Sequence, residues 1–293
     1  MVTEQMRNGY ELSVEDIRIR DPFVVRDSEQ KCYYLFGTTD LNTWDGQGEG
    51  FLVYESRDLR HWSRPAYAFR RPERFWATKN FWAPEVHAYG GSWYMLASFK
   101  ADGRCRGTQI LRAERIQGPY LPISDGPVTP RDWECLDGTL FVDPDGAPWI
   151  VFSHEWLQIG DGAICCARLS PDLKELRGAP VTLFHASDAP WSTPTGGTAA
   201  GCEKTYVTDG PFVYWEKDGT LRMIWSSFRE GRYCVGIAES ETGTILGPWK
   251  QQNQPVLETG GHGMLFEDFS GKRFLAFHSP NTDGDERMKW VEF

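Results

Sequence analysis

The chain has 293 residues, of which 40% are hydrophobic and 25% charged, and this composition is typical of a globular protein. Its net charge of −10 argues against a nucleic-acid or anionic-membrane surface, which needs clustered Lys and Arg. No apolar run reaches the roughly 18 residues of a membrane span. Residues 1–5 also lack the basic-then-apolar order of a secretion signal. We therefore expect a cytoplasmic monomer or small homo-oligomer, unless a signal has been removed.

Cysteine and aromatic content narrow the class only slightly. Seven cysteines are an odd number and form no Cys-x-x-Cys pair, so neither a disulfide framework nor a zinc site is expected. Aromatic residues reach 14%, with 13 Trp. This excess fits β-sheet cores, and it equally fits clefts in which rings stack on sugars.

Short β-rich segments follow one another along the whole chain, separated by Gly, Pro, Asp and Asn. The segments expected to form strands are 32–36, 93–99, 149–153, 221–226 and 273–277. A second group follows four of them, at 51–54, 109–112, 163–166 and 234–237. A parallel α/β fold would need amphipathic helices between strands, and only residues 169–176 look faintly helical.

The strands recur as a repeated unit. Each unit has a polar residue, a short apolar strand, a turn such as Asp145-Gly146 or Asp218-Gly219, and a second strand. Units of four short antiparallel strands at this spacing are propeller blades. We expect an all-β fold: one five-bladed β-propeller over residues 1–293, in which the fifth blade takes a strand from the N-terminus. Residues 187–201 are expected to form a long loop.

The repeat also points to chemistry, because the first strand of every blade lines the central axis of a propeller. The positions that we align on these strands are Asp21, Glu85, Asp137, Asp209 and His262. Clustered carboxyls raise one another's pKa, and proteins retain such clusters chiefly at metal or acid/base sites. Glycoside hydrolysis needs one carboxylic acid and one carboxylate, which this set could supply.

Four ordered motifs carry a resemblance to a known family. They are Arg20-Asp21-Pro22, Trp82-Ala83-Pro84-Glu85, Leu136-Asp137-Gly138-Thr139 with Asp143-Pro144-Asp145-Gly146, and Asp209-Gly210-Pro211. Together they resemble glycoside hydrolase family 43 over nearly the whole chain. The resemblance implies inverting hydrolysis of arabinosides, xylosides or related plant glycans. It also implies Asp21 as general base, Asp137 as the carboxylate that tunes and orients the acid, and Asp209 as general acid.

The acid motif departs from the family, which usually has Glu-Gly-Pro. Asp209 is one methylene shorter, a retreat of about 1.5 Å, and a 1 Å misplacement can cost on the order of 100-fold in rate. Three alternatives stay open. Asp209 acts with a compensating backbone shift, Glu203 or Glu155 reaches in as the acid, or the site is impaired.

His262, in Gly260-Gly261-His262-Gly263, matches a family position that faces the axis and holds a metal ion or water. Calcium prefers six to eight oxygens, so an ion beside a single His would be coordinated mostly by water. Its role would be structural or electrostatic, and no cofactor is expected to be required.

Several other residues are candidates for substrate contact. Trp44, Phe81, Trp82, Trp156 and Trp191 could be sugar platforms, although aromatic residues are more often packing. Glu85 could bind substrate or hold backbone donors of a neighbouring blade. His154-Glu155-Trp156 could form a blade-edge turn or line a subsite. His61, His87 and His185 are expected to be structural or exposed, and His278 is left open.

These observations predict an exo-acting, inverting glycosidase of the α-L-arabinofuranosidase or β-xylosidase type. One alternative is a retaining five-bladed enzyme that cleaves sucrose or fructan. It shares the Arg-Asp-Pro and Glu-Cys pairs seen at residues 20–22 and 134–135, but its upstream Asn-Asp-Pro motif is absent here. The other alternative is a non-catalytic sugar-binding propeller, motivated by the short Asp209.

Overall fold

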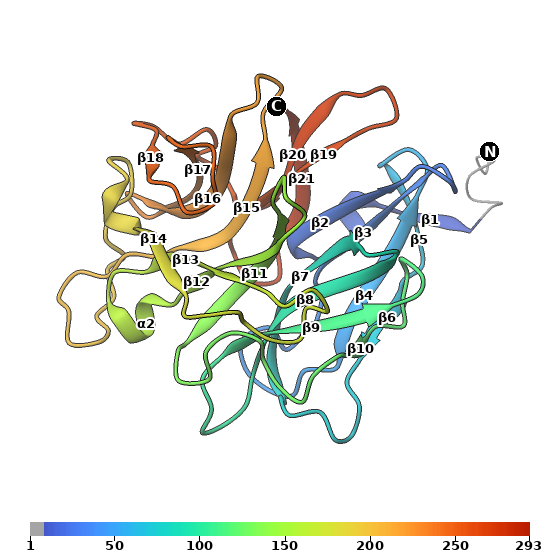
Figure 1. Cartoon of the computed structure of the whole chain (residues 1–293). Coiled ribbons are helices and arrows are strands. Elements are labelled where there is room, and N and C mark those ends of the chain that lie inside the picture. The colour runs from blue at the N-terminus through green and yellow to red at the C-terminus, as the bar shows by residue number, and fades with distance from the viewer. Residues whose placement is uncertain (1–8) are drawn as a thin grey trace.

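The computed structural model describes residues 9–293, which form five antiparallel β-sheets arranged as a five-bladed propeller (Figure 1). The innermost strands β2, β7, β11, β15 and β19 contact one another in that order, and β19 contacts β2 to close the ring. The expected all-β propeller is confirmed. The seven cysteines are all free.

The sheets differ in size. The first contains β1 (Tyr10–Ser13), β2 (Arg20–Asp27), β3 (Cys32–Thr38), β4 (Gly50–Ser56), β5 (His61–Ser63) and β6 (Ala66–Arg70). The second contains β7 (Lys79–Tyr89), β8 (Ser92–Lys100), β9 (Gly107–Ala113) and β10 (Leu121–Pro122). The third contains β11 (Cys135–Val142), β12 (Pro148–His154), β13 (Ala163–Arg168) and β14 (Val181–His185).

The fourth sheet contains β15 (Asp209–Trp215), β16 (Leu221–Arg229), β17 (Arg232–Ser240) and β18 (Trp249–Gln251). The fifth contains β19 (Gly261–Glu267), β20 (Arg273–Ser279) and β21 (Arg287–Glu292). Short helices are η1 (Val14–Asp16), α2 (Trp156–Ile159) and η2 (Ala186–Asp188). Every predicted strand segment falls within a strand. The long loop expected over residues 187–201 begins two residues later, because Ser187 and Asp188 belong to η2, and the connection runs on to β15 at Asp209. Residues 169–176 are not helical; Leu169 and Leu176 instead form an isolated β-bridge.

The prediction for ring closure was wrong. The N-terminal strand β1 pairs with β5 in the first sheet, and the fifth sheet has three strands within residues 9–293. The segment just before β2 still links the first blade to the fifth, because the backbone N–H of Ile19 donates to the carbonyl of Glu286 at 3.1 Å. The Arg20 guanidinium also contacts the Glu286 carboxylate at 2.7 Å. Closure therefore rests on contacts of β2 and the preceding segment with the fifth blade.

All five innermost strands carry the same β-bulge. In the first blade Arg20 pairs with Thr38 and Phe23 with Phe36, so one extra residue is inserted between the two pairs. The same pattern occurs in the other four blades. The bulged residue has left-handed φ each time: Asp21 (51°), Ala83 (47°), Asp137 (55°), Gly210 (49°) and His262 (49°).

This register corrects the alignment made from sequence. Asp21, Asp137 and His262 are equivalent, but Ala83, rather than Glu85, holds the position in the second blade. Gly210, rather than Asp209, holds it in the fourth blade. Asp209 lies one residue earlier and Glu85 two residues later than the alignment assumed. The alignment from sequence matched acidic residues with one another. The bulged position itself has no characteristic residue type, so the sequence does not show where it falls.

Each bulge is held by the preceding blade. The N–H groups of Ala83, Asp137 and His262 donate at 2.8 Å to the hydroxyls of Thr38, Ser98 and Ser226, respectively. The Asp21 N–H donates to Nδ1 of His278 at 3.2 Å. The fourth blade differs in its acceptor: the Gly210 N–H donates to the Asp137 carboxyl of the third blade, and the equivalent hydroxyl, that of Ser153, has no partner among the described residues.

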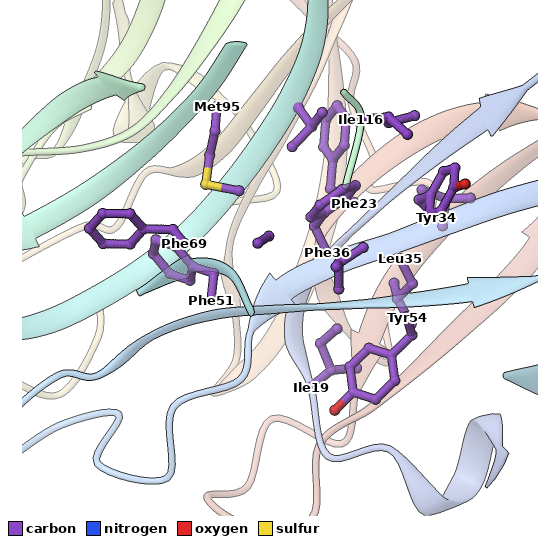
Figure 2. Packing of buried hydrophobic residues seen from close by; sticks show 14 of the residues in the cluster. Ile19, Phe23, Tyr34, Leu35, Phe36, Phe51, Tyr54, Phe69, Met95 and Ile116 are labelled. Carbon is purple, nitrogen blue, oxygen red and sulfur yellow. The ribbon is translucent and has the colours of Figure 1, made fainter. Parts of the chain in front are cut away.

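The hydrophobic core lies between neighbouring sheets. The largest cluster joins the first, second and fifth blades, and Figure 2 shows part of it, with Phe51 and Phe69 near Met95. The Phe51 and Phe69 ring centroids are 6.1 Å apart. Three further clusters join the second to the third blade, the third to the fourth, and the fourth to the fifth. The blades therefore share their cores.

We expect Ser226→Ala to lower the free energy of unfolding by about 1–3 kcal/mol, because the buried His262 N–H loses its acceptor. Ser153→Ala is the matched control, since Ser153 is equally buried but its hydroxyl has no partner among the described residues. Urea unfolding of both variants measures the difference. Equal losses of stability would contradict a holding role for these hydroxyls.

Candidate active site

A cavity of about 600 Å³ opens at the mouth of the ring, where the bulged residues meet. Asp21, Asp137, Asp209 and His262 all line it. The three carboxyls predicted from sequence are therefore brought together on one cavity, with the imidazole of the fifth blade beside them. Asp209 reaches it from the position before the bulge.

Asp21 is held as a carboxylate. The Thr38 hydroxyl donates to its Oδ2 at 2.6 Å, and Nδ1 of His262 lies 3.2 Å from its Oδ1. Burial pushes the pKa of Asp21 up, but His262, His278 and Arg20, together with the Thr38 hydrogen bond, bring its pKa below the ordinary value. An ionised carboxylate at neutral pH can accept a proton.

His278, whose role the sequence left open, accepts a hydrogen bond from the backbone of Asp21. Its Nδ1 accepts the Asp21 N–H, and its Nε2 lies 3.2 Å from Oδ1 of Asn281. This pattern fits the neutral tautomer with hydrogen on Nε2. Burial lowers the pKa of His278 to about 4, consistent with a neutral ring. His278 thus fixes the backbone of Asp21.

The Asp137 carboxyl contacts residues of both the fourth and the fifth blade. Its Oδ2 accepts the Gly210 N–H at 3.0 Å and lies 3.6 Å from Nδ1 of His262. Burial and, next, the Asp21 charge raise its pKa well above the ordinary value. Asp137 is therefore hydrogen-bonded to Gly210, the bulged residue that follows Asp209 on β15.

Asp209 has the opposite character to Asp21. Burial and the neighbouring Asp137 raise its pKa to about 7, against the opposing effects of His262 and of a hydrogen bond from Tyr233. The Tyr233 hydroxyl donates to its Oδ2 at 2.9 Å. A carboxyl with this pKa is partly protonated at neutral pH and can donate a proton.

The two other candidate acids lie in different places. Glu155 lines the cavity, is buried, and has its Oε2 3.4 Å from Nε of Arg106. Glu203 is exposed and does not line this cavity. Only Glu155 of the pair is therefore near the carboxyl cluster.

The aromatic candidates divide between wall and core. Trp44, Trp82 and Trp156 line the cavity. Phe81 and Trp191 do not: Phe81 packs on Phe99 with centroids 4.8 Å apart, and Trp191 packs on Trp225 at 5.0 Å. Both are buried, so they pack between strands and do not form part of the cavity wall.

The Trp82 wall is itself covered on one ring face. The Arg106 guanidinium carbon lies 3.8 Å from its ring centroid, and the Trp44 ring meets it edge-on at 5.3 Å. Arg20 lies over Trp44 in turn, at 4.9 Å. Two arginines thus flank a pair of indole rings along this wall. A sugar can stack only on the ring surface that the arginines leave free.

Glu85 and His154 do not line the cavity. Glu85 is buried and pairs with His87, its Oε2 lying 2.9 Å from Nε2. His154 stacks on Trp133 with centroids 4.2 Å apart, and its Nε2 lies 2.8 Å from Oε1 of Gln158. These contacts favour structural roles for both residues.

Residues 9–293 contain no group of three His, Cys, Asp or Glu arranged to hold a metal ion. Nδ1 of His262 faces two carboxylates, so its ring is engaged with protein acceptors. An ion beside it would depend on water for most of its ligands, as the sequence suggested, and that ion stays a prediction.

We expect Asp209→Asn to stabilise the protein at pH 8 by up to about 4 kcal/mol and to have little effect at pH 4. The folded pKa of about 7 lies above the unfolded value, so the folded state binds the extra proton and its stability falls as pH rises from about 4 to 7. Urea unfolding at both pH values measures the difference. A difference between variant and parent that stays constant over this range would contradict the raised pKa.

Comparisons with known proteins show the family to which the chain belongs. Residues 11–290 match the family model described as Glycosyl hydrolases family 43. The extracellular endo-alpha-(1->5)-L-arabinanase 1 of Bacillus subtilis is 22% identical over 258 residues, which cover 83% of this chain and 71% of that protein. The extracellular endo-alpha-(1->5)-L-arabinanase of Thermotoga petrophila is 25% identical over 308 residues, which cover 90% of this chain and 57% of that protein.

A crystal structure of an endo-arabinase from Bacteroides thetaiotaomicron is similar over 97% of both chains, with a TM-score of 0.89 and 38% identity. The expected cytoplasmic location has no support, since both curated relatives are named extracellular. The expectation drawn from residues 1–5 lies outside the described residues. Within residues 9–293 no helix is long and apolar enough to cross a membrane. The chain belongs to glycosyl hydrolase family 43 and is a glycoside hydrolase built on a five-bladed propeller.

Proposed function

We propose that this protein hydrolyses α-1,5-linked L-arabinan, or oligosaccharides of it, with inversion at the anomeric carbon. The observation that carries the proposal is the opposite tuning of two carboxyls on one cavity: the pKa of Asp21 is lowered and that of Asp209 is raised to about 7. Inverting hydrolysis needs such a base and acid at once. The arabinanase names of the relatives support the choice of sugar.

The chemistry follows from these protonation states. The Asp21 carboxylate takes a proton from a water molecule while the water oxygen bonds to the anomeric carbon. Asp209 gives its proton to the glycosidic oxygen as the bond from that oxygen to the anomeric carbon breaks. Attack and departure occur on opposite faces, so the configuration inverts. Asp21 ends protonated and Asp209 ionised, and exchange with solvent resets both.

The surrounding groups set this difference. Thr38 and His262 stabilise the charge on Asp21 through the contacts described above. Asp137 raises the pKa of Asp209 and holds the Gly210 N–H next to it. Asp137 therefore acts on the acid, in the tuning role that the resemblance implies.

The mode of cleavage is a separate part of the proposal. Sequence led us to expect exo action on oligosaccharides, and that expectation stays untested. The names of all three relatives described above contain the prefix endo, which favours internal cleavage of the polysaccharide. Internal cleavage yields a ladder of oligosaccharides from the first minutes, whereas exo action yields one small product.

Incubation with linear arabinan should release reducing ends of inverted configuration, because water attacks opposite the leaving group. Proton NMR of the first products measures the anomer, and chromatography measures their size. Xylan, aryl xyloside and aryl arabinofuranoside are the comparison substrates. Retained configuration would favour the sucrose- and fructan-cleaving class. Sugar binding by folded protein with no turnover of any substrate would favour a binding module and contradict hydrolysis.

Asp21→Asn and Asp209→Asn should each lower kcat/KM on arabinan by about 10²–10⁴-fold, the usual contribution of a general acid or base. The loss for Asp209→Asn should shrink on an aryl arabinofuranoside with an activated leaving group, which departs without protonation. Glu203→Gln is the control and should leave activity unchanged. If Glu155→Gln, and not Asp209→Asn, gives the leaving-group-dependent loss, Glu155 is the acid.

A further inference from the structure

Tyr233 is a residue that sequence analysis did not single out, yet its side chain contacts the acid. It lies at the start of β17, is 6% exposed, and lines the cavity. Its hydroxyl donates to Oδ2 of Asp209 at 2.9 Å. Of the four aspartates that line the cavity, Asp209 is the one that accepts a hydrogen bond from a tyrosine hydroxyl within residues 9–293.

The Tyr233 ring is fixed in place on several sides. Its centroid lies 5.1 Å from that of Phe228 and 5.5 Å from that of His278. Its backbone carbonyl accepts the Gly260 N–H at 3.1 Å. A Cβ added to Gly261 would lie 2.2 Å from the ring, so only glycine leaves space for it. The hydroxyl thus has little freedom to move away from Asp209.

The register makes the role of this glycine clear. Gly261 is equivalent to Asp209 on the repeated inner strand, together with Arg20, Trp82 and Leu136. The other four positions carry side chains that line the cavity. Gly261 of the fifth blade lacks a side chain, and the ring of Tyr233, from β17 of the fourth blade, fills that space. Its hydroxyl is therefore presented at the mouth by packing.

We infer that Tyr233 is a positioning residue for the general acid: its hydroxyl occupies Oδ2 of Asp209 and leaves Oδ1 as the oxygen that delivers the proton. This inference rests on the proposed function of Asp209. The carbonyl oxygen of a protonated carboxyl is its better acceptor, so a phenol O–H that donates to Oδ2 favours the acidic hydrogen on Oδ1. When the Oδ1–H bond breaks and the proton passes to the glycosidic oxygen, Tyr233 still donates to the new carboxylate.

The pairing also accounts for the aspartate. A glutamate on the same backbone would extend its carboxyl by about 1.5 Å, which is incompatible with a 2.9 Å hydrogen bond from an immobile phenol. Tyr233 and Asp209 therefore form a matched pair. A glutamate at position 209 would need a different residue at position 233.

Other charged groups also act on Asp209 and must be separated from Tyr233. Asp137 and Asp21 raise its pKa, whereas His262 lowers it. Arg20 acts on Tyr233 itself. Tyr233→Phe leaves all of these charges unchanged, so a shift in the titration of Asp209 reports the lost hydrogen bond.

The first test titrates Asp209 by carbon NMR of protein labelled at the aspartate carboxyls. Loss of one signal in Asp209→Asn assigns it. We expect the pKa of Asp209 to be higher in Tyr233→Phe, because the hydrogen bond favours the carboxylate. Tyr54→Phe, a buried tyrosine that does not line the cavity, is the control. This readout needs no substrate, so it stands even if arabinan is not hydrolysed.

The second test is kinetic. Tyr233→Phe should lower kcat on arabinan on the order of 10-fold, as expected for a hydrogen bond to a charged group, with KM nearly unchanged and the alkaline limb of the pH profile moved upward. The loss should shrink on an activated aryl arabinofuranoside. In Asp209→Glu the same tyrosine change should be harmless or beneficial, giving strong non-additivity.

An unchanged carboxyl titration, or equal losses on both substrates, would overturn the inference. If Tyr233→Phe does not fold, fluorinated tyrosine at position 233 replaces it. The fluorinated phenol is a stronger donor, so it should lower the pKa of Asp209, and a pKa that stays the same or rises would contradict the role.

Discussion

The bulge repeated on five inner strands is the constraint on which the site depends. Side chains of a strand alternate between faces, so one inserted residue changes which side chains face the mouth. A left-handed residue other than glycine costs of order 1–3 kcal/mol and persists only where its surroundings fix it. Here the preceding blade supplies an acceptor for the backbone N–H of all five bulged residues. Closure of the ring then brings the bulges together.

The electrostatic difference between the two sides of the cavity follows from what each blade contributes. The fifth blade supplies His262, whose Nδ1 lies 3.2 Å from Oδ1 of Asp21 and favours its ionised form. The third and fourth blades supply two carboxyls with raised pKa values: burial and the Asp21 charge raise the pKa of Asp137, and burial and Asp137 raise that of Asp209. Two aspartates at one end of the propeller can therefore have pKa values shifted in opposite directions, as a base and an acid require. Burial acts on all three, and the neighbours decide the sign.

Sequence predicted the blades well because a strand pair with a glycine turn is a local pattern. It placed Asp21 and Asp137 correctly for the same reason. It misaligned Glu85 and Asp209 because the bulge position has no characteristic residue: Ala83 and Gly210 carry no chemistry of their own. Phe81 and Trp191 could not be separated from Trp44 by sequence, since only packing between blades decides which rings are buried. Tyr233 was missed because it comes from a third strand, outside the repeated motif.

Glycine breaks the fivefold pattern twice, and both breaks serve the acid. At Gly210 a Cβ would lie 2.8 Å from the His262 ring, so the missing side chain lets that ring approach while the N–H holds Asp137. At Gly261 the missing side chain lets Tyr233 reach Asp209. Asp21, the proposed base, by contrast occupies a bulge position that keeps its side chain and has a left-handed φ of 51°. Under the proposed roles, the short acid is served by the side chains packed around it, while its strand keeps the same bulged register as the other inner strands.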